Sequence, residues 1–138
     1  MTAGALQAGD GRGTAADPLR VLFVEDSAVD AELIAAELKR GGHEVRYERV
    51  DTEEAFLGAL TASQWDLIIS DFSMPHFDGL TAYKVYSRQN YDIPFIFVTG
   101  SLDEETAVES IKAGASDYVT KPVDADQLIG LLRVWLSR

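Results

Sequence analysis

The sequence predicts an α/β protein whose parallel, doubly wound sheet is covered by helices on both faces. Short apolar runs alternate five times with segments of helical periodicity, and the connections between them are short. One of these runs, residues 67–71, ends in the carboxylate of Asp71 and leads into a turn closed by Pro75. In open parallel sheets, ligands bind in the crevice beyond the carboxyl ends of the strands. Asp71 is therefore the first candidate for a functional residue.

Length, charge and composition narrow the class of protein. The 138 residues suit one domain, and the absence of cysteine excludes thiol catalysis, disulfides and cysteine metal sites. The net charge of −11 repels phosphate backbones, so we expect no direct nucleic-acid binding. No apolar run approaches the ~18 residues of a membrane helix, and no signal peptide is evident, so we expect no membrane insertion. We predict a cytoplasmic domain at residues 18–138, preceded by a disordered lead at residues 1–17.

The first half of the chain predicts two strands and two helices. Residues 19–24 are apolar on both faces, as a central parallel strand requires, whereas residues 44–50 alternate between apolar and charged, as an edge strand does. The helix between them is capped by Ser27 and stopped by a Gly-Gly pair. A second helix follows a cap at Asp51 or Thr52. Its predicted inner face consists of Phe56, Ala59 and Leu60.

The second half of the chain continues the alternation after the strand that ends at Asp71. A third helix opens at Asp78-Gly79, and its apolar residues are Leu80, Tyr83 and Tyr86. Residues 93–98 predict the fourth strand, and a capping-box pattern at residues 101–104 opens a helix whose thin apolar stripe runs to Gly114. Residues 118 and 119 predict a brief fifth strand. The apolar stripe of the last helix consists of Leu128, Leu131, Leu132 and Trp135.

Charged and hydroxyl residues collect where the predicted strands end. Glu25 and Asp26 end the first strand, Asp71 the third, Thr99 the fourth and Lys121 the fifth. Each close pair of carboxylates costs about 4 kcal/mol at an effective dielectric of ~20, so the site needs either a raised pKa or a divalent cation. Oxygen ligands suit Mg²⁺, and an ammonium and a hydroxyl beside it suit a phosphoryl group. A carboxylate can attack phosphorus to give an acyl phosphate.

Four segments, in this order and spacing, resemble the receiver domain of two-component response regulators. They are Val24-Glu25-Asp26-Ser27, Ser70-Asp71-Phe72-Ser73-Met74-Pro75, Val98-Thr99-Gly100 and Ala115-Ser116-Asp117-Tyr118-Val119-Thr120-Lys121-Pro122. The resemblance extends from about Pro18 to the end of the chain. It implies a flavodoxin-like sheet of five parallel strands in the order 2-1-3-4-5, with five helices.

The resemblance also implies roles for the residues of the site. It implies that Asp71 accepts a phosphoryl group from a histidine kinase or a histidine phosphotransfer protein. It further implies that Mg²⁺ (or Mn²⁺) is bound by Asp26, Asp71 and the backbone carbonyl of Ser73, with Glu25 acting through a water molecule. Such a domain is a signalling module rather than an enzyme, and its only reactions are self-catalysed phosphotransfer and slow autodephosphorylation. Ser73 stands where the family varies, at a position that influences the attacking water.

The resemblance implies a conformational switch as well. Thr99 resembles the hydroxyl that moves to the phosphoryl group, and Tyr118 the aromatic residue that then changes rotamer. Gly100 follows the switch residue and leaves the site open. Lys121-Pro122 resembles a cis peptide that aims the ammonium inward, and cis costs little before proline. The switching surface is then the face made by helix four, strand five and helix five.

The last helix carries more apolar residues than its stripe needs. They are Ile129, Val134 and Leu136. We expect this surplus either to bury against a homodimer partner or an unseen output domain, or to reflect a helix packed more broadly on the sheet.

Other functions fit parts of this pattern. Asp71 alone could be a turn residue. An aspartyl-phosphate hydrolase of the haloacid-dehalogenase type needs a general-acid aspartate two residues after the nucleophile, where this chain has Ser73. A flavodoxin-like or dinucleotide carrier needs glycine or threonine around phosphate after the first strand, where Glu25 and Asp26 would repel it. A docking module that never accepts phosphate remains open.

Overall fold

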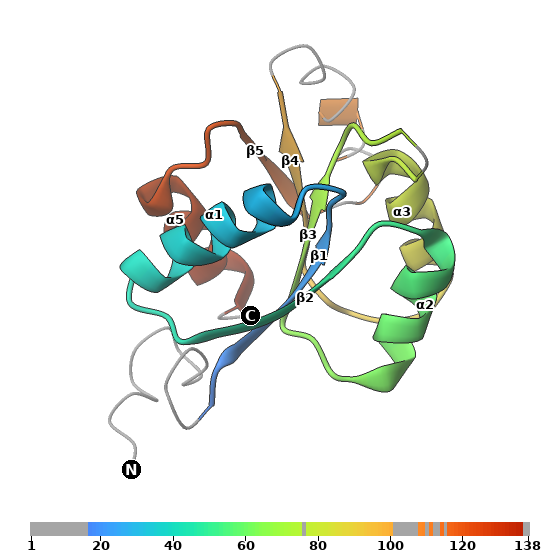
Figure 1. The fold of residues 1–138 in the computed structure, drawn as a ribbon, viewed down its shortest axis with the longest axis horizontal. Coiled ribbons are helices and arrows are strands. Elements are labelled where there is room, and N and C mark those ends of the chain that lie inside the picture. Colours follow the sequence, from blue (N-terminus) through green and yellow to red (C-terminus); the bar gives the residue numbers. More distant parts are fainter. Residues whose placement is uncertain are drawn as a thin grey trace.

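The structure is a computed structural model that describes residues 17–75, 77–100, 108, 109, 111, 114 and 116–136. Its centre is a parallel five-stranded sheet in the order β2-β1-β3-β4-β5 (Figure 1). The strands are β1 (Leu19–Val24), β2 (Val45–Val50), β3 (Leu67–Asp71), β4 (Phe95–Thr99) and β5 (Asp117–Thr120). Every neighbouring pair is parallel, so the predicted fold class and strand order are confirmed.

Helices cover both faces of the sheet. Those bounded within the described residues are α1 (Ala28–Arg40), α2 (Glu53–Ala62), α3 (Gly79–Ser87) and α5 (Ala125–Leu136). Helices α1 and α5 lie on one face, and α2 and α3 lie on the other (Figure 1). Most of the helix predicted to run to Gly114 falls outside the described residues, although residues 108, 109 and 111 are helical. The predicted disordered lead also falls outside them, except for Asp17.

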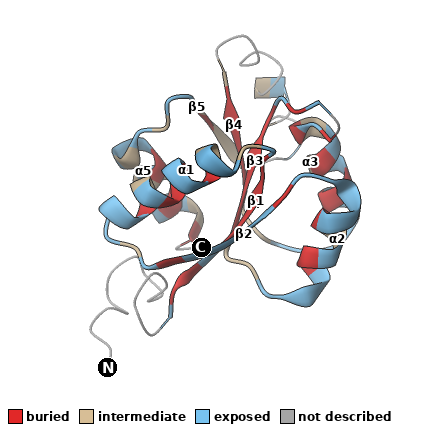
Figure 2. Ribbon diagram, viewed as in Figure 1, coloured by how far each residue is buried: buried red, intermediate tan, exposed pale blue. Residues whose placement is uncertain are grey.

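Buried residues occupy most of the strands and parts of the helices beside them (Figure 2). Their apolar side chains form two clusters, one on each face of the sheet. Because successive residues of a strand point to opposite faces, β3 sends Ile69 to the cluster under α1 and α5 and Ile68 to the cluster under α2 and α3. All residues of β1 except Arg20 are completely buried, as predicted for a central strand. Each such aliphatic or aromatic side chain contributes about 1.5–3 kcal/mol through its burial.

The helices begin where the sequence places their caps. The side-chain oxygens of Ser27, Thr52 and Asp78 each accept a hydrogen bond from the backbone N–H three residues later. These bonds satisfy N–H groups that the first turn of a helix leaves without partners. The first of them ties the start of α1 to the segment that follows β1, where the acidic residues of the site lie.

The buried face of α5 differs in part from the one predicted. In α3, the apolar residues named from the sequence all contact the core: Tyr86 is buried, and Leu80 and Tyr83 are half-buried. The remaining buried residues of α3 are Gly79, Ala82 and Val85. In α5 the fully buried residues are Leu128, Leu132 and Leu136. Leu128 and Leu132 belong to both the predicted and the observed stripe, and the rotation of the helix about its own axis decides that Leu136 is the third buried residue.

The apolar surplus of α5 mostly packs within the domain. Leu136 is buried, and Ile129 packs partly against the cluster under α1 and α5, next to Gly41. Val134 is 60% exposed. For Ile129 and Leu136 the structure therefore favours the alternative of a helix packed broadly on the sheet.

Replacing Gly79 with alanine is expected to destabilise the domain by about 1–3 kcal/mol, the usual cost of overpacking. A Cβ at this position would lie 2.6 Å from the backbone oxygen of Asp71 and 2.7 Å from the Cα of Phe72. The loop after β3 would have to move away from α3, and the hydrogen bond from the Gly79 N–H to the Phe72 carbonyl would be strained. Urea unfolding measures the loss.

Gly58 provides the matched control for this substitution. It lies inside α2, and nothing stands within 4 Å of the position that a Cβ would occupy. Gly58→Ala should leave stability unchanged or raise it by up to about 1 kcal/mol, since alanine is the better helix former. Equal losses at the two positions would contradict the argument from close packing.

Candidate functional site

Three carboxylates meet at the carboxyl edge of the sheet. Asp71 is the last residue of β3, and Glu25 and Asp26 follow the last residue of β1. The two strands are direct neighbours in parallel register. As a result, one carboxylate oxygen from each of the three side chains lies within 4.8 Å of the other two. Glu25 and Asp71 are buried, and Asp26 is exposed.

Lys121 brings a positive charge to this cluster from the residue after β5. Its Nζ lies 3.5 Å from Oδ2 of Asp71 and 3.6 Å from Oδ2 of Asp30, which is in the first turn of α1. The backbone N–H of Lys121 donates to the carbonyl of Thr99, so β4 and β5 remain paired up to this residue. The peptide bond between Lys121 and Pro122 is cis. The two distances from Nζ show that the side chain points toward the carboxylates of Asp71 and Asp30.

Burial dominates the protonation of the acidic residues. It raises the pKa of Glu25 to about 7, and the negative charge of Asp71 adds to the effect, whereas the Ser27 N–H and the Lys121 ammonium oppose it. Burial also raises the pKa of Asp71, against the lowering effect of Lys121. For Lys121 itself, burial lowers the pKa, but the carboxylates of Asp71, Glu25 and Asp30 outweigh burial and raise it overall.

The hydroxyl and backbone groups expected at the site lie at the same edge. The Ser73 N–H donates to Oδ1 of Asp71 at 3.3 Å. Thr99 ends β4, is completely buried, and donates its hydroxyl to the carbonyl of Gly100 at 2.9 Å. Tyr118 pairs in register with Phe97 and packs against the cluster under α2 and α3. By the alternation of a strand, Thr99 faces that same side, and Asp71 faces the side of α1 and α5.

Two residues at the site escaped the sequence analysis. Asp30, in the first turn of α1, was not among the expected site residues, but its carboxylate pairs with Lys121. Arg49, near the end of edge strand β2, donates from Nη1 to the backbone carbonyl of Glu25 at 3.2 Å. The sequence could have indicated only that Arg49 lies near Glu25, because the ends of β1 and β2 are in register. It could not indicate the hydrogen bond itself, because every residue has a backbone carbonyl.

The donor set fits a hard divalent cation. Carboxylate oxygens are the ligands that Mg²⁺ prefers, and it commonly binds through one or two of them while keeping several waters. Glu25, Asp26 and Asp71 provide such oxygens, and two of these carboxylates are buried and mutually repelling. A cation would remove that repulsion. The arrangement therefore suits magnesium-dependent chemistry on an oxyanion.

Comparison with known proteins places the chain in a family. The sequence model of the response regulator receiver domain matches residues 21–133. The chain belongs to the response regulator receiver domain family. It is therefore a receiver domain of two-component signalling, and the predicted family is confirmed.

Relatives of this receiver domain are longer proteins. It is 34% identical to the response regulator protein FleR of Pseudomonas aeruginosa over 82% of the chain, and 29% identical to the cell cycle transcriptional regulator CtrA of Caulobacter vibrioides over 87%. The chain spans 24% of FleR and 51% of CtrA. Within the part of the chain that the structure describes, no helix is long and apolar enough to cross a membrane.

The chain is also similar to a solved receiver domain. The receiver domain of the sensor histidine kinase PA1611 from Pseudomonas aeruginosa PAO1 is 26% identical and superimposes with a TM-score of 0.73, covering 88% of this chain and 99% of that one. That structure contains a magnesium ion coordinated in the active site cleft.

The metal-free receiver domain is expected to become less stable as the pH rises from about 5 to 8. The folded-state pKa of Glu25, about 7, lies above its ordinary value of 4.5. Between these values the folded state keeps a proton that the unfolded chain has released, so the free energy of unfolding falls as the pH rises. The loss is on the order of 1–3 kcal/mol. Thermal unfolding in EDTA across this pH range measures it.

Two glutamine substitutions separate Glu25 from the general charge of the protein. Glu25→Gln should make the dependence on pH less steep, because only the contribution of Asp71 to it remains. Glu32→Gln removes an exposed charge from α1 and should leave the dependence as it is in the wild type. A slope as steep in Glu25→Gln as in the wild type would contradict the assignment.

Proposed function

We propose that this receiver domain accepts a phosphoryl group on Asp71 from a histidine kinase or a histidine phosphotransfer protein. The observation that supports the proposal most strongly is the placement of the Lys121 ammonium 3.5 Å from a buried carboxylate that also belongs to a three-acid cluster. A turn-capping aspartate requires neither neighbour. The cluster suits a cation, and the ammonium suits the oxygens of a phosphoryl group.

The chemical step needs little from the protein beyond position and charge. A carboxylate oxygen of Asp71 forms a bond to phosphorus, and the bond from phosphorus to the donor imidazole nitrogen breaks, with its electron pair going to that nitrogen. Lys121 donates a hydrogen bond to an oxygen of the transferred group. The Ser73 N–H already bonds to Oδ1 of Asp71 and keeps the carboxylate in one orientation.

We assign the cation ligands in the same way. Asp26, Asp71 and the backbone carbonyl of Ser73 would bind Mg²⁺ (or Mn²⁺), and Glu25 would act through a water molecule. When bound, the ion neutralises negative charge on the carboxylates and on the phosphoryl oxygens. Arg49 supports this arrangement by fixing the Glu25 carbonyl, and the Ser27 N–H bonds to the Glu25 carboxylate at 3.1 Å.

The proposed consequence of phosphorylation is a change of surface. The phosphorylated side chain carries roughly −1.5 to −2 charges, in place of the single negative charge of the Asp71 carboxylate. Thr99 would exchange its bond to the Gly100 carbonyl for a bond to the new oxygens, and Tyr118 would occupy the space that this movement leaves. The face that includes β5 and α5 would then rearrange and pass the signal on, to a second copy or to an output domain. We place this reaction in the cytoplasm and expect neither nucleic-acid binding nor membrane insertion by the domain itself.

A phosphorylation assay tests the proposal against a docking module that never accepts phosphate. The chain is incubated with Mg²⁺ and a small-molecule phosphodonor such as acetyl phosphate, and its intact mass is measured. We expect a gain of one phosphoryl group that EDTA prevents. An unchanged mass with Mg²⁺ present would leave the docking module as the better reading.

A further inference from the structure

One ammonium at the site serves two carboxylates that come from different directions. The Nζ of Lys121 is almost equally far from Asp71, at 3.5 Å, and from Asp30, at 3.6 Å. Asp71 belongs to the sheet and its side chain is 9% exposed, whereas Asp30 belongs to α1 and its side chain is 42% exposed. The charge of Lys121 is thus divided between the buried acceptor and a carboxylate at the surface.

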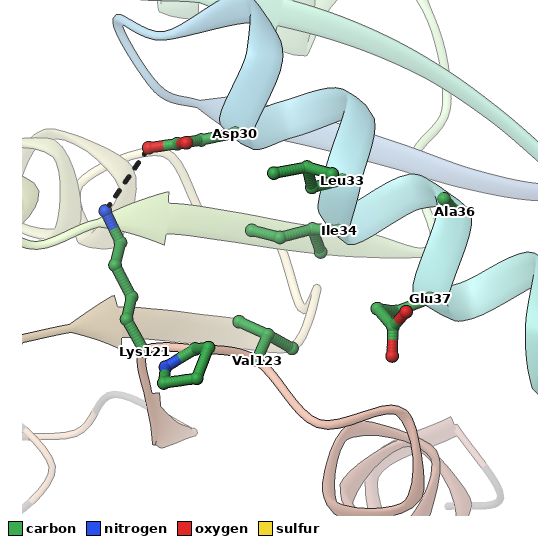
Figure 3. A pocket seen from close by; sticks show the side chains of 8 residues that line it. Asp30, Leu33, Ile34, Ala36, Glu37, Lys121 and Val123 are labelled. Carbon is green, nitrogen blue, oxygen red and sulfur yellow. Dashed lines mark ion pairs between the residues drawn. The ribbon is translucent and has the colours of Figure 1, made fainter.

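Asp30 lies where a groove begins. The groove has a volume of about 580 Å³ and runs between α1 and the segment after β5. Asp30 and Lys121 stand together at one end of it, and Glu37 stands farther along the same helix (Figure 3). Apolar side chains, among them Ile34 and Val123, line the wall between them. The Asp30–Lys121 pair therefore stands at the border between the acidic cluster and the surface.

The position of Asp30 is fixed by its backbone. Its N–H donates to the Oγ of Ser27, the N-cap of α1, at 3.1 Å. Ser27 directly follows Asp26 of the acidic cluster. The ion pair between Asp30 and Lys121 therefore connects the start of α1 to the residue after β5. The carboxylate of Asp30 adds to the field of Asp71 and Glu25 at the ammonium.

We propose that Asp30 is a positioning residue. It shares the Lys121 ammonium with Asp71, and so it weakens the binding of that ammonium to a phosphoryl group. The inference rests on the proposed function of Asp71. A phosphoryl group on Asp71 would draw the ammonium toward its own oxygens, and the contact with Asp30 would then be lost. Asp30 also repels an anionic phosphodonor that approaches along this border. Both effects make phosphoryl uptake slower than it would be with Lys121 and Asp71 alone.

The size of the effect follows from the exposure of the pair. Partly exposed ion pairs are weak, so removing Asp30 should accelerate uptake at low donor concentration by about threefold to fivefold. The change should reside mainly in the donor concentration that gives half the maximal rate. If Asp30 only stabilised the first turn of α1, its removal would change neither the rate of uptake at low donor concentration nor the donor concentration that gives half the maximal rate.

The experiment compares Asp30→Asn with Glu37→Gln and Asp30→Glu in the full chain. Glu37→Gln removes the same charge from the same helix and groove, but Glu37 pairs with Arg40 rather than Lys121. Phosphorylation by acetyl phosphate with Mg²⁺ is followed as a function of donor concentration. Side-chain NMR at pH 7 follows the Cε resonance of Lys121, assigned by its absence in Lys121→Met.

We expect Asp30→Asn to accelerate uptake and shift the Lys121 resonance, Glu37→Gln to do neither, and Asp30→Glu to restore wild-type behaviour. An unshifted resonance in Asp30→Asn, a rate no higher than that of the wild type, or an equal gain in Glu37→Gln would overturn this inference alone. A wild-type chain that takes up no phosphoryl group would instead overturn the proposed function, and this inference with it.

Discussion

Asp71→Asn is expected to abolish phosphoryl uptake while leaving the domain folded and slightly more stable at neutral pH. Asparagine has nearly the shape of aspartate and can still accept the hydrogen bond from the Ser73 N–H. It carries no charge, however, and an amide does not form the acyl phosphate. Because burial raises the pKa of Asp71, the ionised carboxylate lowers the stability of the metal-free protein.

Intact mass after treatment with acetyl phosphate and Mg²⁺ measures the first effect, and thermal unfolding in EDTA measures the second. Asp78→Asn is the matched control, since Asp78 caps α3 at the surface and asparagine caps as well as aspartate. It should take up phosphate as the wild type does. Phosphate on the Asp71→Asn chain would show that another residue is the acceptor.

Lys121→Met should reduce the rate of phosphoryl uptake by about 100-fold or more, the usual cost of removing a group that stabilises developing charge. Methionine keeps the aliphatic stem and removes only the ammonium, which lies 3.5 Å from Asp71. Magnesium binding should survive, and at pH 8 it should tighten, because the ammonium both repels the cation and competes for the same carboxylates. Intact mass followed over time gives the rate of phosphoryl uptake, and calorimetric titration gives the affinity for Mg²⁺.

Lys84→Met tests whether the loss of any lysine has this effect. Lys84 is exposed in the last turn of α3, on the opposite side of the sheet from Lys121. The substitution should change neither quantity. If Lys121→Met lost magnesium binding together with phosphoryl uptake, the role of Lys121 would be to hold the loops in place rather than to bind the phosphoryl group.

The sheet and the meeting of the acids could be predicted because both follow from one-dimensional patterns. Runs that are apolar on both faces predict central strands. Because parallel strands end at one edge of a sheet, Glu25, Asp71 and Lys121 were expected together at that edge. The caps at Ser27 and Thr52 could be predicted for a similar reason, since a cap bonds to a backbone N–H only three residues away.

The remaining features depend on distances that no pattern encodes. The pairing of Asp30 with Lys121 requires knowing how α1 lies against the residue after β5, and the bond from Arg49 reaches a backbone carbonyl on another strand. The buried stripe of α5 was misjudged because Leu136 and Trp135 both fit a helical period. The rotation of the helix about its own axis decided between them.

The alternation of side chains along the strands puts Asp71 and Tyr118 in different layers of the molecule. The main chains of β3, β4 and β5 form a continuous barrier between those layers, so a rearrangement that joins the two residues must travel over the rim of the sheet. Thr99 ends the strand that lies between them. In the proposed switch, the tip of β4 is therefore where a signal from Asp71 would cross to the layer that holds Tyr118.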